Sequence, residues 1–525
     1  MYTDHYFVVD EMAKESETDC VGDDTFLQLF ETHKHALLSI DPTSCLNEDT
    51  FESLRKVREL TAHAGLHKNA EGMDFCETIV GKLTERLCAL KIPEKVGEIL
   101  TKLSSVWKNE EENSEYEAFL VEGFSLLKNI ASSDKKHTQT IVKLEIIPFA
   151  RKVFLECSIT RRLHVTIVSF LNSVISELEE SVLLKVNTEF IYQMLFVLTR
   201  FKRQLLTQQS CSQSLLCDSC ADIHESTTSV LGMFATIFKF KNAKYMDSDL
   251  FKKIVIVLCA IVKDCLEDKI VIASLEALVS VSDVSYFLPD FVTTTRDYGY
   301  ASVICALLRH ENATIRQKAT LVFGNLLLTE TATDTILKTP ILTDILSLFY
   351  CEDGDRAMFL VSNISLNGSG DLLSTVYLFD LIPYTVFCLK SNKIRVVINS
   401  LLTITNLVCK FKDTKYKERL LAHDKYGIVE AIMPFFDADH FTEPQPEEDE
   451  KREALDLISD TLSWIHSFLS DLLSEPDEAQ NLIDAQKYDV PIKLIHEALQ
   501  RNDDEMFEDL RERFNSLSAV LKNIG

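Results

Sequence analysis

The sequence predicts an all-α protein in which similar helical units stack one after another, and two observations support this fold class. First, a phrase of apolar residues that ends in a small residue, an asparagine and another apolar residue returns along the chain. Second, the 525 residues include only 14 Gly and 11 Pro. So few helix-breaking residues in so long a chain favour helices that are joined by short turns.

The recurring phrases define a period of about forty residues. Asn129 and Asn172 are 43 residues apart, Asn325 and Asn363 are 38 apart, and Asn363 and Asn406 are 43 apart. Further units carry another polar residue at the asparagine position, namely Thr236, Asp283 and Asp460. This period in an apolar helical sequence is typical of armadillo or HEAT repeats. We therefore predict a right-handed armadillo-repeat solenoid, a superhelix of about 9–10 three-helix repeats with a concave peptide-binding groove.

The chain is expected to have two parts. Residues 1–48 are predicted to form an acidic N-terminal segment, and residues 49–525 the solenoid. Insertions are expected near residues 203–224 and 437–453, because the units there are longer than the period. Stacking of repeats explains how one continuous core can exceed the size of an ordinary domain.

The unit that contains Asn325 shows the elements expected in each repeat. Residues 310–312 are predicted to form a turn, 313–317 a short first helix, and 318–328 the longest helix. Apolar residues at helical spacing in 333–349 predict the opening helix of the next unit. In this three-helix order the longest helices stack side by side and line the concave groove.

The charge of the chain limits its partners. The net charge is −27 and the isoelectric point is about 4.9. A nucleic-acid-binding protein needs a basic surface, so no nucleic acid partner is expected. A basic partner would gain attraction and faster encounter with this chain. Acidity that merely keeps a large solenoid soluble explains the charge equally well.

Composition also bears on compartment. No apolar run reaches the about 18 residues of a membrane-spanning helix, and the acidic N-terminus lacks the apolar region of a signal peptide. The 14 cysteines are scattered, mostly within apolar helical stretches. This distribution is typical of reduced core residues in an intracellular protein, and we expect no membrane association.

A cysteine cluster in the first insertion has the residue types of a metal site. Its members are Cys211, Cys217, Cys220 and His224. Three thiolates and an imidazole can bind Zn²⁺ tetrahedrally, and Cys-x-x-Cys is a usual ligand spacing. The alternative is a Ser/Cys-rich surface loop in which these residues cluster by accident. We adopt the second interpretation and expect neither a metal nor another cofactor.

Motifs of catalysis are not found in the sequence. It contains no G-x-x-x-x-G-K, G-x-S-x-G, H-E-x-x-H or G-x-G-x-x-G pattern. Asn367–Gly370 reads Asn-Gly-Ser-Gly, which is more simply a turn between helices. We therefore do not expect an enzyme.

The repeated asparagine has two interpretations. Its side chain can satisfy the backbone of a neighbouring helix, which is a structural role. Alternatively, the amides form a row along the groove, where each can donate and accept hydrogen bonds with the main chain of an extended peptide. Five asparagines in one register favour the second interpretation.

Three segments of the chain resemble phrases of the importin-α family, the armadillo adaptors that carry nuclear-localisation signals. They are Lys128–Glu156 (KNIASSDKKHTQTIVKLEIIPFARKVFLE), Phe359–Ser391 (beginning FLVSNISLNGSG) and Asn481–Phe514 (beginning NLIDAQKYDVPIKLI). The resemblance covers about residues 50–520, and its specificity lies in the order of the phrases.

The resemblance implies a nuclear import adaptor of the cytoplasm and nucleus. Its ligands would be basic nuclear-localisation-signal peptides of cargo proteins, and the family's carriers are importin-β and a nuclear export receptor. The implied peptide-binding residues are Asn129, Asn172, Asp283, Asn325, Phe359, Asn363 and Asn406. Among them, Asn129 and Asn172 match the family's major site, and Asn363 and Asn406 match its minor site.

Two features depart from the family pattern. The family has a tryptophan four residues before each asparagine, whereas these positions here hold Ser125, Val168, Gly232, Leu321, Phe359 and Leu402. The family also begins with a strongly basic importin-β-binding segment, whereas residues 1–50 contain only Lys14 and Lys34 as basic residues besides histidine. We therefore predict that peptides bind chiefly in the minor half and that importin-β does not bind the N-terminus. The alternative function is an armadillo scaffold that binds another extended protein partner without a transport role.

Overall fold

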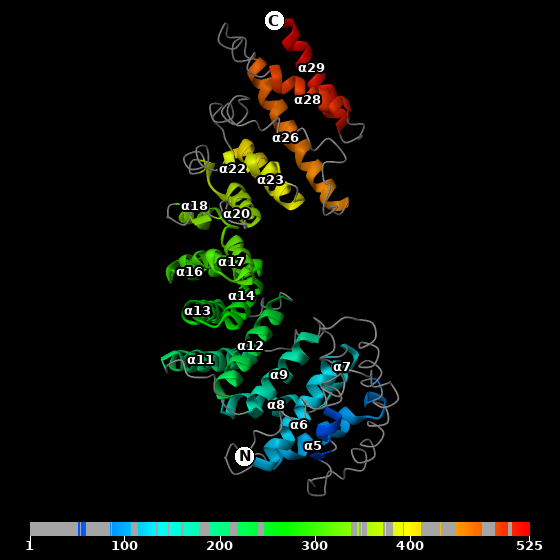
Figure 1. The fold of residues 1–525 in the computed structure, drawn as a ribbon, viewed down its shortest axis with the longest axis vertical. Helices are drawn as coiled ribbons and strands as arrows, with labels where there is room; N and C mark the ends of the chain where they lie inside the picture. The colour runs from blue at the N-terminus through cyan, green and yellow to red at the C-terminus, as the bar shows by residue number, and fades with distance from the viewer. Residues whose placement is uncertain are drawn as a thin grey trace, which may run out of the picture. The chain divides into compact units, whose positions relative to one another are not determined.

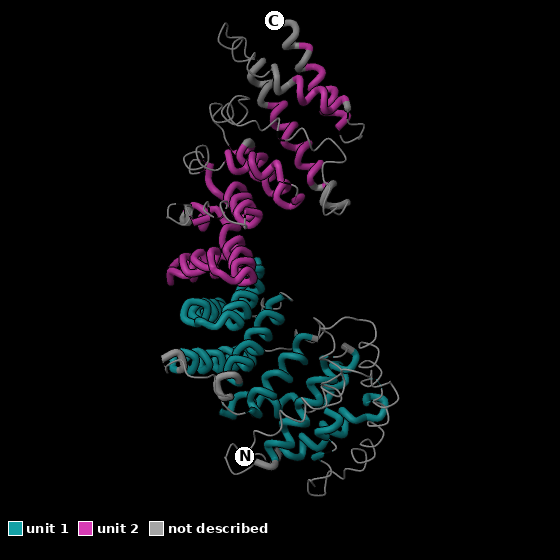
Figure 2. Tube along the Cα trace, in the orientation of Figure 1, with its two compact units in different colours: residues 1–286 teal, residues 287–525 magenta. Residues whose placement is uncertain are grey.

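The structure is a computed structural model in which every regular element of the described residues is a helix (Figure 1). The described residues are 51–52, 54–58, 85, 87–106, 114–132, 135–144, 146–158, 162–177, 188–210, 218–239, 246–337, 344–345, 348, 354–370, 373, 382–391, 393–410, 431, 448–474, 489–501 and 507–524. The chain divides into two compact units, residues 1–286 and 287–525 (Figure 2).

The first unit begins, in its described part, with helical residues 51–52 and 54–58, which we call the N-terminal helix. The helices that follow are α5 (Ile92–Val106), α6 (Ser114–Ala131), α7 (Lys135–Val142), α8 (Ile147–Glu156), α9 (Arg162–Glu177), α11 (Thr188–Ser210), α12 (Asp218–Lys239), α13 (Ser248–Asp264) and α14 (Asp268–Ser282). Helices α6, α9, α12 and α14 pack consecutively, each against the next. The intervening helices α7 and α8 lead into α9, which is the three-helix order of an armadillo repeat.

The second unit repeats this arrangement. Its helices are α15 (Leu288–Asp297), α16 (Tyr300–Ala306), the 3₁₀ turn η4 (Leu307–Arg309), α17 (Ala313–Leu326), α18 (Glu330–Leu337), α20 (Gly354–Asn367), α22 (Ile382–Leu389), α23 (Ile394–Lys410), α26 (Glu448–Ser474), α28 (Asp489–Arg501) and α29 (Glu508–Ile524). Helices α17, α20, α23 and α26 pack consecutively. The predicted all-α armadillo-repeat solenoid is thereby confirmed.

The consecutively packed helices of both units share one register. The residue two positions before each asparagine, or its equivalent, is at most 1% exposed. These residues are Leu127, Phe170, Phe234, Val281, Phe323, Val361, Ile404 and Ile458. Two residues turn an α-helix by about 200°. The core residue and the asparagine position therefore lie on opposite sides of each helix, and we call these helices the row helices.

One predicted boundary within the repeat is wrong. Residues 313–317 and 318–328 were expected to form two helices, but α17 runs unbroken from Ala313 to Leu326. Asn312 caps its N-terminus, because the Asn312 side chain accepts from the N–H groups of Thr314 and Ile315 at 2.9 and 3.4 Å. No Gly or Pro separates the two predicted pieces, so nothing interrupts the helix.

The described helices differ from membrane-spanning helices in length and composition. None of them is by itself long and apolar enough to span a membrane. One bent pair, Asp268–Ser282 with Ser285–Asp297, meets the criteria of length and composition only when both helices are taken together.

His164 on α9 is a buried titratable group in the core of the first unit. Its side chain is 0% exposed, and Nε2 donates to the carbonyl oxygen of Phe154 at 3.1 Å. Nδ1 is buried without a hydrogen-bond partner. Burial, with a smaller contribution from the charge of Arg200, lowers the pKa of His164 to about 4, against the opposing effect of the bond to Phe154. The ring is therefore neutral at pH 7.

We predict that this histidine makes the first unit sensitive to acid. Below the ordinary histidine pKa of about 6.5, His164 is protonated in the unfolded chain but stays neutral in the folded protein. The free energy of unfolding therefore decreases as the pH falls from about 6.5 to about 4. Between pH 7 and about 5.5 the loss is about 1 kcal/mol. Urea unfolding of the parent and of His164→Gln, whose side chain cannot titrate, measures this loss at both pH values. The lower pH of 5.5 is above the isoelectric point of about 4.9, so the protein keeps a net negative charge. His496→Gln on α28 is the control, and an equal loss in all three proteins would contradict the prediction.

Candidate peptide-binding face

The five asparagines predicted from the sequence all lie within row helices. They form, with Thr236 of α12, a set that we call the asparagine row: Asn129, Asn172, Thr236, Asn325, Asn363 and Asn406. Every member is half-buried and lies in the second half of its helix. The structure therefore presents one polar side chain at an equivalent position of α6, α9, α12, α17, α20 and α23.

Three of the row amides bond to a helix that precedes their own in the chain, and for two of them that helix is a row helix. Asn363 Nδ2 donates to the carbonyl oxygen of Gly324 at 3.3 Å, which joins α20 to α17. Asn406 Nδ2 donates to Ser365 Oγ at 3.2 Å, which joins α23 to α20. An amide has two N–H groups and a carbonyl oxygen, and each of these bonds uses one N–H. At Asn363 and Asn406 the side chain thus has the structural role that the sequence left open, a bond to a neighbouring helix. That bond uses one of the two N–H groups of each amide.

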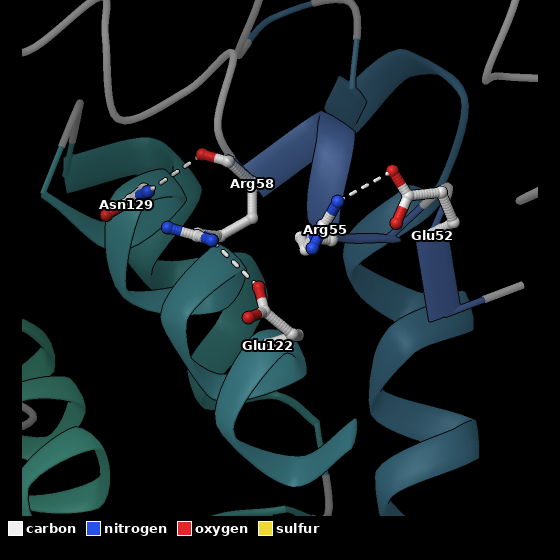
Figure 3. Close-up of polar contacts among 5 residues, drawn as sticks. All are labelled: Glu52, Arg55, Arg58, Glu122 and Asn129. Atoms are coloured by element: carbon white, nitrogen blue, oxygen red, sulfur yellow. Dashed lines mark hydrogen bonds and ion pairs between the residues drawn. The ribbon is translucent and has the colours of Figure 1, made fainter. Parts of the chain in front are cut away.

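The third bond involves the N-terminal helix (Figure 3). Asn129 Nδ2 donates to the carbonyl oxygen of Arg58 at 3.5 Å. The Arg58 side chain also forms an ion pair with Glu122 of α6, with Nε 2.8 Å from Oε2. Arg55 pairs with Glu52 in its own helix at 2.9 Å. The basic residues of this segment are therefore engaged within the first unit, beside the first asparagine of the row.

Glycines allow the row helices to approach closely at two places. A Cβ atom at Gly232 of α12 would lie 3.1 Å from Oδ1 of Asn172, an oxygen that is buried without a hydrogen-bond partner. A Cβ atom at Gly324 of α17 would lie 2.6 Å from Cε1 of Phe359 and 3.3 Å from Nδ2 of Asn363. The absence of a side chain at Gly324 thus permits both the bond from Asn363 and the position of the Phe359 ring.

The positions four residues before the row have different environments in the two units. In the first unit Ser125 is half-buried, Val168 is fully buried, and Gly232 lies against Asn172. In the second unit Leu321 is exposed, and Leu402 is half-buried against Ile394, Ile398 and Ala454. Phe359, predicted as the aromatic of the peptide site, is half-buried, and its ring edge packs over Gly324.

Two members of the predicted register differ from the asparagines. Thr236 donates its Oγ1 hydrogen to the carbonyl oxygen of Gly232 in the same helix at 3.0 Å, so this hydroxyl serves its own backbone. Asp283 is the C-cap residue of α14, one residue beyond the last residue of that helix, and its side chain is exposed. The register placed Asp283 on a helix like the others, but α14 ends at Ser282.

Trp464 is a candidate site residue that does not occupy any of the positions four residues before the asparagines. It lies on α26 and is exposed, one turn after the exposed Asp460. Residues four apart share a helix face. Thr461 between them contacts Thr405 of α23, with the two hydroxyl oxygens 2.7 Å apart. The sequence carries this signal as a tryptophan four residues after the register position Asp460, whereas the tryptophan of the importin-α pattern lies four residues before it.

The predicted cysteine cluster lies largely outside the part of the chain that the structure describes. Cys211 and Cys217 lie outside the described residues, and His224 is half-buried on α12. Within the described part of the chain, no group of three His, Cys, Asp or Glu residues is placed to hold a metal ion. Burial raises the pKa of the thiols of Cys88 and Cys388 to about 11 and of Cys305 to about 12, so these cysteines are protonated at neutral pH.

Comparisons with known proteins identify the fold and not a family. No protein-family model matches the chain, and no curated protein matches it. Among solved structures, an engineered protein of the Northeast Structural Genomics Consortium matches 94% of this chain and 99% of its own, with 12% identity and a TM-score of 0.57. A structure of the interaction between cadherin and β-catenin matches 93% of this chain and 100% of its own, at 11% identity and TM-score 0.49.

A designed armadillo repeat protein in complex with the peptide (KR)4 is similar over 50% of this chain and 99% of its own, at 14% identity and TM-score 0.37. At these identities a likeness concerns the fold alone, and the two comparisons with TM-scores below 0.5 carry no argument. The class that the helices define is an armadillo-repeat protein, a fold that typically serves as a non-enzymatic binding scaffold.

We predict that Gly324→Ala destabilises the second unit. The new methyl group would meet the Phe359 ring, and overpacking of this kind costs about 1–3 kcal/mol, which exceeds the about 1 kcal/mol gain in helix propensity. Gly354→Ala at the start of α20, where an added Cβ has no neighbour within 4 Å, is the matched control and leaves stability unchanged or higher. Urea unfolding compares them. Equal stability of the two variants would show that Phe359 moves away at no cost.

Proposed function

We propose that this chain is an adaptor that binds extended segments of partner proteins along the asparagine row. In its finer form the proposal is an importin-α-like import adaptor, which takes basic nuclear-localisation signals of cargo and works in the cytoplasm and the nucleus. The observation that carries the proposal is the asparagine row itself, with amides at equivalent positions on α6 and α9 of the first unit and on α17, α20 and α23 of the second. The order of the importin-α-like phrases in the sequence supports the finer form.

The chemistry of the row suits an extended main chain. An extended peptide has unpaired N–H and C=O groups along its length, and a carboxamide can pair with either. Asn363 and Asn406 each give one N–H to a neighbouring helix, which holds the amide in place before a ligand arrives. A side chain positioned in advance loses less conformational freedom on binding.

The charge of the chain supports a basic ligand. At a net charge of −27 the protein attracts cationic segments over a distance that depends on salt. Such attraction raises the association rate more than the intrinsic affinity. Binding of a basic peptide is therefore expected to weaken between low and physiological salt.

A second candidate function is an armadillo scaffold for another extended partner without a transport role. The residues at the tryptophan positions of the importin-α family favour this second function. Val168 is buried and Gly232 lies against Asn172, so neither presents an aromatic ring to a cationic side chain. A stacked tryptophan contributes about 0.5–2 kcal/mol to binding a cation. Titration with a bipartite basic peptide at two salt concentrations separates the two functions, because the scaffold has no reason to bind that peptide.

We predict that the second unit contributes more to binding a basic peptide than the first. Asn363→Ala with Asn406→Ala removes two amides and weakens binding by well over tenfold, since each lost hydrogen bond costs about 1–3 kcal/mol. Asn129→Ala with Asn172→Ala has a smaller effect. Fluorescence anisotropy with the bipartite peptide measures both double variants beside the parent.

Asn515→Ala, on α29 outside the row, is the control for that comparison. Because Asn363 and Asn406 also join neighbouring helices, the unfolding midpoint of each variant is measured, and binding is compared where all proteins are folded. A larger effect of the 129/172 pair would place the working site in the first unit. No effect of either pair would leave the row with a structural role alone.

We predict that importin-β does not bind this protein through residues 1–50, which lie outside the described residues. The segment has only Lys14 and Lys34 to meet an acidic carrier, which is too little charge for a strong complex. Pull-down with purified importin-β and with a nuclear export receptor measures carrier use. Robust importin-β binding that is lost on deletion of residues 1–50 would contradict the prediction.

A further inference from the structure

The residues on either side of the asparagine row differ in chemistry between the two units. In the second unit each asparagine lies between two apolar or weakly polar side chains, four residues before it and three after it. The three sets are Leu321–Asn325–Leu328, Phe359–Asn363–Leu366 and Leu402–Asn406–Cys409. In α20 and α23 these positions, i, i+4 and i+7, lie on one face of the helix. Leu328 lies in the turn after α17, two residues beyond the end of that helix at Leu326. We call this surface the apolar row face.

Solvent reaches this face. Leu321 is 38% exposed, Leu328 42% and Leu366 53%. Leu366 is also held in place, because Lys410 Nζ donates to the carbonyl oxygens of Leu366 and Gly368, the latter at 2.8 Å. Exposed leucines on α17, in the turn that follows it and on the neighbouring α20 are unlike the scattered apolar residues of an ordinary surface.

The first unit lacks this pattern. Around Asn129 the equivalent positions hold Ser125 and Ser132, and around Asn172 the flanking Val168 and Ile175 are buried. The asparagine row is therefore common to both units, whereas an exposed apolar flank belongs to the second.

The next row helix adds charge. On α26 the exposed side chains of Asp456, Asp460 and Trp464 follow one another at four-residue spacing. Trp464 is 44% exposed. An indole face beside carboxylates suits a cationic side chain, through both charge and the ring. This end of the apolar row face is thus complementary to a basic residue.

We propose that the second unit binds an extended protein segment that has apolar side chains over α17, α20 and α23 and a basic side chain over α26. The inference rests on the proposed function, binding of extended segments, and specifies the ligand. Neighbouring helices lie about 8–10 Å apart and an extended chain advances about 3.3 Å per residue, so about two to three ligand residues pass each helix. Main-chain groups meet the asparagines, and every second or third side chain meets an apolar flank.

Two fluorescent peptides of about twelve residues test this. The first has leucine at alternate positions, separated by serine, and ends in two arginines; in the second every leucine is serine, so the charge is the same. The full-length protein is expected to bind the leucine peptide at least about tenfold more tightly. Equal affinities would overturn the inference.

Variants locate the effect. Leu328→Ser with Leu366→Ser is expected to weaken binding of the leucine peptide by about tenfold and to leave the serine peptide unchanged. Tyr298→Ser with Phe387→Ser removes exposed apolar side chains elsewhere in the same unit, at the C-cap of α15 and on α22. This pair is the matched control and changes the binding of neither peptide. If the control pair weakens binding as much as the leucine pair, the peptide adheres nonspecifically and the inference fails.

The basic end has its own variant. Asp460→Asn with Trp464→Ala is expected to weaken both peptides about equally and to flatten the salt dependence, because both carry the same arginines. If the salt dependence of binding is unchanged in this variant, α26 does not bind the basic side chains of the peptide. If the leucine peptide has no advantage while a bipartite basic peptide binds, only this inference fails; if no extended peptide binds at all, the proposed function fails with it.

Discussion

The contact between successive row helices is the interaction on which the rest of this structure depends. In a solenoid each repeat touches only its neighbours, so stability and the binding face both come from one contact made many times. Here the contact has an apolar and a polar part. The ring of Phe359 lies against Gly324 of the preceding row helix, and the amide of Asn363 bonds to the carbonyl oxygen of the same glycine. Together they set the spacing and the register of every side chain on the row.

The polar part of this contact changes how the asparagines are understood. From the sequence, a structural role and a ligand-binding role are alternatives. In the structure one amide N–H of Asn363, and one of Asn406, bonds to the preceding helix, and the chemistry of an amide leaves it more hydrogen-bonding capacity than that bond uses. The structural bond therefore orients the group that would bind a ligand. Gly324 is required for this bond, because a side chain at that position would clash with the Phe359 ring and crowd the amide of Asn363.

A common row with different flanks is a way to bind different ligands on one scaffold. Main-chain recognition by amides is indifferent to ligand sequence, so selectivity must come from the flanking residues. Those flanks are serines or buried residues beside Asn129 and Asn172, and leucines beside Asn325 and Asn363. The fold alone does not specify function, and here the chemistry at −4 and +3 from the row distinguishes the two units.

The sequence by itself determined the helical class, the period and the register of the row, because burial of one helix face recurs every 3.6 residues and is encoded locally. That is why Ile458 and Val281 occupy the core position even in units that lack an asparagine. Only the tertiary structure decided that α14 ends before Asp283, that Phe359 lies over Gly324, and that Trp464 is exposed beside Asp460. Such features depend on contacts between residues of different helices and on the side chains that those contacts leave exposed to solvent. A local sequence pattern encodes neither the contacts nor the exposure.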